Sequence, residues 1–132
     1  MQKYFKVLLL ALLLVLSVGC AQKSSALEGT ASYHERIALP PNAVLEITLE
    51  DVSLMDIKAP VLAQKSTQIV GQTPFAFSLE YDPTLIQERH RYNLRAKITI
   101  EGKLIFITDT MQPVLTKNSP EKLNLKMVQV KR

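Results

Sequence analysis

Apolar and polar residues alternate with a period of two along several short stretches of this chain. The clearest stretch is Ala43–Asp51, where the alternating residues are Leu45, Ile47 and Leu49 on one side and Glu46, Thr48 and Glu50 on the other. Successive side chains of a β-strand point to opposite faces of a sheet. The pattern therefore predicts a strand with one dry face and one face in water.

Further strand signals lie on both sides of this stretch, and turn-forming residues separate them. The stretches are Gly29–Arg36, Val61–Val70, Pro74–Tyr81, Tyr92–Glu101, Lys103–Thr110 and Leu123–Val130. Val61–Val70 is polar in its middle, which is typical of an edge strand where Lys65 discourages further pairing. About seven short strands without a long helix predict an all-β fold, an antiparallel β-sandwich.

Four details of these strands and their connections can be predicted from local chemistry. The aromatic-rich face of Pro74–Tyr81 belongs in the core, because aromatic side chains bury much area per residue. Polar residues of Tyr92–Glu101, such as Asn93, are expected to face water. Glu101-Gly102 suits a tight hairpin turn, and Asp82 can cap a short helical turn that begins at Pro83.

An apolar run near the start of the chain has a different meaning. Val7–Val18 spans 12 residues, whereas a membrane-spanning helix needs about 20. Lys3 and Lys6 precede the run, as basic residues do in secretory signal peptides. Small residues follow it near Gly19. We therefore predict a signal peptide over residues 1–19.

Cys20 is the only cysteine in the chain, so an internal disulfide is excluded. From this position alone it could be a free thiol, part of an intermolecular bridge or the acceptor of a lipid. The box Ser17-Val18-Gly19-Cys20 resembles the bacterial lipoprotein signal, although the usual leucine is Leu16, one residue further back. This resemblance implies cleavage before Cys20 and lipidation of its sulfur. The alternative is ordinary signal cleavage near Ala21, which leaves Cys20 as a free thiol.

The residues after Cys20 extend this interpretation. Residues 20–26 are small and polar and suit a tether between the membrane and a domain over residues 27–132. Ala21 and Gln22 follow the cysteine, with no aspartate at the second position. By resemblance to enterobacterial sorting, this favours the periplasmic face of the outer membrane.

Composition limits the remaining possibilities. Residues 20–132 amount to 113 residues, which is enough for one domain. The formal charge of +4 for the full chain falls to about +2 without Lys3 and Lys6. The basic residues do not cluster into a broad face, and there is no tryptophan. A nucleic-acid partner is therefore not expected.

Catalytic patterns are weak in this sequence. The two histidines, His34 and His90, lack the spacing of a zinc site, and no Gly-x-Ser-x-Gly elbow occurs. The carboxylates Glu46, Glu50 and Glu101 are expected on wet strand faces, and Asp109 is expected to end a strand or to hydrogen-bond the sheet. We predict no enzyme activity, no cofactor, no metal site and no small-molecule substrate.

Several segments together resemble the YbaY/YscW-type lipoprotein domain. The resemblance covers most of Gly29–Thr116 and is weaker in Lys117–Arg132. The segments that carry it are Gly29–Ala43 (GTASYHERIALPPNA), Leu45–Ser53 (LEITLEDVS), Tyr81-Asp82-Pro83, His90-Arg91-Tyr92, Leu94-Arg95-Ala96 and Asp109-Thr110.

The resemblance implies a β-sandwich without a catalytic motif. Members in type III secretion systems act as pilotins, which bind an outer-membrane secretin subunit and help it reach or assemble in that membrane. Free-standing envelope members also exist. We therefore expect a membrane-anchored binding domain with an envelope protein such as a secretin as partner. The alternative is an accessory envelope lipoprotein tied to polysaccharide or stress physiology, with no secretin partner.

Overall fold

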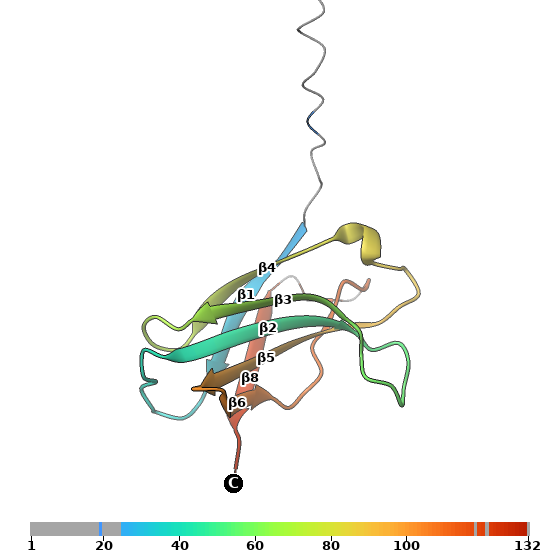
Figure 1. Ribbon diagram of the computed structural model, residues 1–132. Helices are drawn as coiled ribbons and strands as arrows, with labels where there is room; N and C mark the ends of the chain where they lie inside the picture. Colours follow the sequence, from blue (N-terminus) through green and yellow to red (C-terminus); the bar gives the residue numbers. More distant parts are fainter. Residues whose placement is uncertain (1–18, 20–24, 118, 121, 132) are drawn as a thin grey trace, which may run out of the picture.

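The computed structural model describes residues 19, 25–117, 119, 120 and 122–131. These residues form one sheet of eight strands and a single 3₁₀ turn (Figure 1). The elements are β1 (Ser25–Tyr33), β2 (Ala43–Asp51), β3 (Val61–Gln68), β4 (Phe75–Tyr81), η1 (Pro83–Leu85), β5 (Tyr92–Ile100), β6 (Lys103–Thr108), β7 (Pro113–Val114) and β8 (Leu123–Gln129). The prediction of an all-β fold is confirmed.

The strands do not form two separate sheets, as the sandwich prediction required. They pair in the continuous order β3-β2-β5-β6-β8-β1-β4, and the short β7 pairs with β5. The sheet curls until its two edge strands, β3 and β4, approach each other, which gives a nearly closed, barrel-like shape. Alternation specifies the inward face of each strand but not its partner, so the sequence pattern suits either arrangement.

One strand pair also departs from the expected antiparallel arrangement. β1 runs parallel to β8, with Gly29 opposite Leu123. A Cβ atom on Gly29 would lie 2.2 Å from the backbone oxygen of Leu123, so glycine permits this close approach. β1 begins at Ser25. Ser25 and Ala26, which we predicted to belong to the tether, are thus the first residues of a strand.

The core fills the inside of the curled sheet. Every long strand except β3 contributes fully buried residues, and Leu62 and Ala63 of β3 pack against the margin of the core. Phe75 and Leu79 of β4 are buried, while Phe77 and Tyr81 pack against the core from its margin, as predicted for this strand. The remaining buried apolar residues are Ala31, Tyr33, Ala43, Leu45, Ile47, Leu49, Ile69, Tyr92, Leu94, Ala96, Ile98, Phe106, Val114, Leu123, Leu125 and Met127.

Several local predictions are confirmed. Glu101 and Gly102 have φ angles of 51° and 76° and turn the chain between β5 and β6. The Asp82 side chain accepts a hydrogen bond from the backbone nitrogen of Thr84 and caps η1. β3 lies at the edge of the sheet. β6 ends at Thr108, directly before the exposed Asp109.

The two ends of the sheet carry different loops. Ser25 pairs with Tyr81, and Asp51 pairs with Tyr92. The start of β1 therefore lies at the same end as the connections 52–60 and 82–91, and we call this the entry end. The opposite end, which we call the far end, carries the connections 34–42 and 69–74.

Candidate functional site

The expected lipidation site is not among the described residues. The predicted signal peptide lies outside them except for Gly19, and Cys20 and residues 21–24 lie outside them as well. Lipidation of Cys20 therefore stays a prediction. No helix in the described part of the chain is long and apolar enough to cross a membrane.

The two histidines do not come together. His34 follows β1 at the far end and is exposed, whereas His90 lies in the connection before β5 at the entry end. Among the described residues, no three side chains of histidine, cysteine, aspartate or glutamate gather where they could hold a metal ion.

His90 instead joins a polar cluster with Asp51 and Ser53. The imidazole Nδ1 of His90 lies 2.6 Å from Oδ2 of Asp51. The other Asp51 oxygen accepts hydrogen bonds from the backbone nitrogen of Ser53, at 2.9 Å, and from its hydroxyl. Burial alone would raise the pKa of the Asp51 carboxyl. The hydrogen bonds from Ser53 and His90 outweigh burial and hold this pKa below its usual value.

This cluster holds the connection 52–60 in place. The backbone nitrogen of Val52 donates to the oxygen of Arg91 at 2.8 Å, and the nitrogen of Arg91 donates to the Ser53 hydroxyl at 2.8 Å. The nitrogen of Asp51 donates to the oxygen of Pro60 at 3.0 Å and closes the base of the loop. The polar cluster is thus structural: it fixes one loop of the entry end to another.

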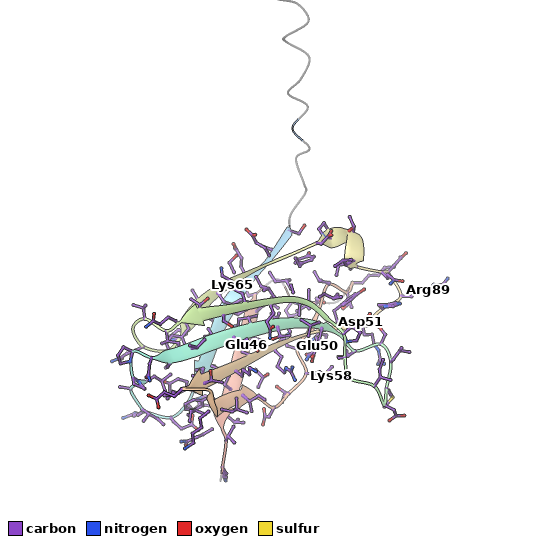
Figure 2. All side chains as sticks on the ribbon, in the orientation of Figure 1. Glu46, Glu50, Asp51, Lys58, Lys65 and Arg89 are labelled. Atoms are coloured by element: carbon purple, nitrogen blue, oxygen red, sulfur yellow. The ribbon has the colours of Figure 1, made fainter. Side chains whose placement is uncertain are left out.

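A second polar group lies on the outer face of β2 and β5 (Figure 2). We predicted this face to be wet, but Thr48, Glu50 and Asn93 are only 3%, 7% and 5% exposed. The Asn93 amide donates to Oε1 of Glu50 at 3.1 Å, and Arg95 lies 3.5 Å from Oε2 of Glu50. The side chains of Asn93 and Arg95 therefore help to cover the Glu50 carboxylate, which alternation alone places on a solvent-exposed face.

Glu46 shows the same effect nearer the far end. Its carboxylate lies 3.0 Å from Nζ of Lys97 and accepts a hydrogen bond from the Gln64 amide at 2.7 Å. These pairs satisfy one another across β3, β2 and β5. They do not bring two carboxylates into a shared cleft, which an acid–base pair would need.

The two edge strands of the sheet, β3 and β4, face each other across a seam. Each of these strands pairs on one side only, so each presents backbone groups on its other side. Lys65 spans the seam, and its Nζ donates to the backbone oxygen of Ser78 at 3.2 Å. The lysine thus covers the edge, as the sequence suggested, by reaching the strand opposite.

An apolar groove lies where the seam meets the far end. It has a volume of about 320 Å³ and is lined by residues from β2, β3 and β4 and from the connection between β3 and β4. Buried Leu45, Ile69 and Phe75 contribute its apolar lining, whereas Val70 is 88% exposed. A free strand edge beside an apolar groove offers backbone pairing and a side-chain pocket to an extended peptide.

The fold and this seam define a class: a small all-β domain with a free strand edge suited to binding another polypeptide. The chain belongs to the YscW family, described as type III secretion system lipoprotein chaperones, and the family model matches residues 22–127. The family expected from the sequence is therefore confirmed. The described function of the family is that of a chaperone, which agrees with the expectation of a non-catalytic domain.

Two individual proteins give the same picture. The chain is 45% identical over 105 residues to the uncharacterized lipoprotein YbaY of Escherichia coli K12. That match covers 79% of this chain, and the chain spans about 55% of that relative's length. This chain is also similar to the solved structure of an alternative pilotin from the type II secretion system of Vibrio cholerae. The sequence identity is 40% and the TM-score is 0.79. This second match covers 83% of the chain and all of the pilotin chain.

Proposed function

We propose that the chain is a lipoprotein anchored through Cys20 to the periplasmic face of the outer membrane, where its domain binds a secretin subunit. Binding would help the subunit reach or assemble in that membrane. The family of lipoprotein chaperones and the likeness to a type II secretion pilotin support this function.

The observation that carries the proposal is the seam between β3 and β4 with its adjoining groove. An extended segment of the partner pairs with the free edge of β3, and an apolar side chain of that segment enters the groove beside Ile69 and Phe75. Lys65 leaves Ser78 when the segment binds, and its ammonium becomes available to an acidic residue of the partner.

The first experiment combines palmitate labelling with a crosslinked pull-down from membranes. Wild type is compared with Cys20→Ala. We expect label on wild type only, its recovery in the outer-membrane fraction, and co-purification of a secretin. Labelling without a secretin would favour the alternative, an accessory envelope lipoprotein. Equal labelling and fractionation of both proteins would overturn the anchor itself.

A second experiment tests the seam. Val70 is exposed at the rim of the groove, and Val70→Asp places a charge where we expect an apolar partner side chain. Val128→Asp is the matched control, because Val128 is an exposed valine on β8. We expect Val70→Asp to lose the secretin and Val128→Asp to retain it. Retention by both variants would place the partner elsewhere.

A further inference from the structure

Large apolar side chains are exposed on the loops of the entry end. In the connection 52–60, Leu54, Met55 and Ile57 are 68%, 81% and 54% exposed. Leu85 of η1 and Met111, after β6, add two further exposed apolar side chains at this end, at 47% and 59%. Three apolar residues grouped on one loop are more than the scattered single residues that a protein surface usually shows.

The loop that carries these residues has a defined shape. Its base is closed between Asp51 and Pro60, and Ser53 is held by Asp51 and Arg91. Asp56 has a φ of 68°, which turns the chain between Met55 and Ile57. These hydrogen bonds fix the base of the loop. They do not involve the side chains of Leu54, Met55 and Ile57, which therefore stay exposed on a fixed support.

The position of the connection 52–60 relative to the predicted lipid anchor indicates which surface this loop faces. Ser25 is five residues beyond Cys20, and five residues span at most about 18 Å. Ser25 pairs with Tyr81, which directly precedes the connection 82–91, and Arg91 bonds to the connection 52–60. A lipid on Cys20 would therefore hold the entry end next to the bilayer.

The charges around the loop fit a lipid headgroup layer. Exposed residues of the connections 52–60 and 82–91 carry three cations, Lys58, Arg89 and Arg91, and three anions, Asp56, Asp82 and Glu88. Figure 2 shows Lys58 and Arg89 at the same end of the sheet as Asp51. Phosphatidylethanolamine offers both a phosphate and an ammonium group, so this balanced set finds partners of each sign.

We propose that the connection 52–60 is a membrane-docking loop, which inserts Leu54, Met55 and Ile57 into the lipid interface and fixes the orientation of the domain. This inference rests on the proposed anchor at Cys20. With the entry end on the bilayer, the groove at the far end faces the periplasm. Docking is driven by apolar burial and has little dependence on salt, since the loop charges balance.

The test uses the full lipidated protein in vesicles of phosphatidylethanolamine with a minority of phosphatidylglycerol. An environment-sensitive fluorophore is attached through Met55→Cys in one preparation and Val70→Cys in the other. Both are highly exposed apolar positions, at the entry and far ends respectively. We expect lipids with a shallow doxyl quencher to reduce the fluorescence at position 55 and to leave position 70 unchanged, at low and high salt alike.

Each other outcome overturns the proposal. Absence of quenching at position 55, with Cys20 labelled by palmitate, shows that the anchor stands but the loop does not dock. Equal quenching at both positions shows that no end is preferred. Crosslinking of position 55 to a protein in native envelopes, without lipid quenching, makes the loop a partner interface. If Cys20 carries no palmitate, the proposed anchor fails, and the docking inference, which rests on that anchor, fails with it.

Discussion

Nδ1 of His90 lies 2.6 Å from Oδ2 of Asp51, although 39 positions separate the two residues in the chain. The contact joins the end of β2 to the connection before β5. It also orients the Asp51 carboxylate, whose other oxygen binds Ser53 at the start of the connection 52–60. This single contact between an imidazole and a carboxylate thus connects both loops that meet at the entry end.

The Asp51 carboxylate should stabilise the domain. In Asp51→Asn the charge is lost and the hydrogen bonds to His90 and Ser53 weaken, so we expect the free energy of unfolding to fall by roughly 1–2 kcal/mol. Urea denaturation near neutral pH measures the change. Asp109→Asn is the control, because Asp109 is exposed beyond β6. Equal losses in both variants would contradict a role for the cluster.

The same carboxylate predicts a pH dependence. The pKa of Asp51 is lowered in the folded protein from its usual value of 3.8. Its contribution is therefore fully present above that value and is lost as the pH falls through the lower folded pKa. We expect the difference in stability between wild type and Asp51→Asn to be constant at neutral pH and to shrink in acid. A difference that stays constant to the lowest pH would reject this account.

The buried amide of Asn93 should matter more than an exposed one. Its nitrogen donates to Glu50 and its oxygen accepts from the backbone of Gln112 at 2.8 Å. Asn93→Ala leaves both groups short of a partner inside the protein, so we expect a loss of about 2–4 kcal/mol by urea denaturation. Asn42→Ala is the matched control, since Asn42 donates to Glu101 at an exposed site. A change within about 0.5 kcal/mol is expected there.

The burial of these polar groups could not be predicted from the sequence. Alternation predicted the inward faces of β2 and β5 correctly, because hydrophobic burial imposes a period of two on each strand. Alternation also placed Glu50 and Asn93 on the outer face. It could not show that the two residues lie directly opposite each other on β2 and β5. Register is a property of two strands together. The burial of this pair therefore became visible only in the assembled sheet.

The sequence also could not distinguish a sandwich of two sheets from one curled sheet. No residue pattern predicted that β1 runs parallel to β8, or that β3 and β4 form the two edges of one sheet and lie next to each other. Only Gly29 carried a local signal, because a glycine within a strand often marks a close backbone approach. Likewise, Lys65 indicated an edge, but not that its ammonium reaches Ser78 on the other edge.

The close approach at Gly29 gives a direct test of the parallel pair. Gly29→Ala brings a Cβ to 2.2 Å from the Leu123 oxygen, so β1 and β8 must separate. We expect a loss of about 1–3 kcal/mol or more, as for other overpacked sites. Thermal unfolding compares it with Gly102→Asn, in a turn where a Cβ meets nothing within 4 Å and asparagine tolerates positive φ. A smaller loss at Gly29 than at Gly102 would argue against the parallel pairing.

Tyr33 joins the core to the connection 34–42 and should be sensitive to alkali. Its ring stacks on Phe106 with centroids 4.3 Å apart, and its hydroxyl donates to the oxygen of Ile37 at 2.7 Å. Burial, together with the charge of Glu35, raises the pKa of Tyr33 above 10.0. The neutral phenol therefore stabilises the fold fully below that pH, and this contribution is lost as the pH rises through the folded pKa.

Tyr33→Phe keeps the stacked ring and removes the hydroxyl. We expect wild type to exceed this variant by roughly 1 kcal/mol in free energy of unfolding near neutral pH, the value of one hydrogen bond. The difference should shrink in strong alkali, where the phenol ionises. Urea denaturation across this pH range measures both effects, with Tyr81→Phe at the margin of the core as the control. If the difference grows with pH instead, the hydroxyl does not stabilise the fold as a neutral donor.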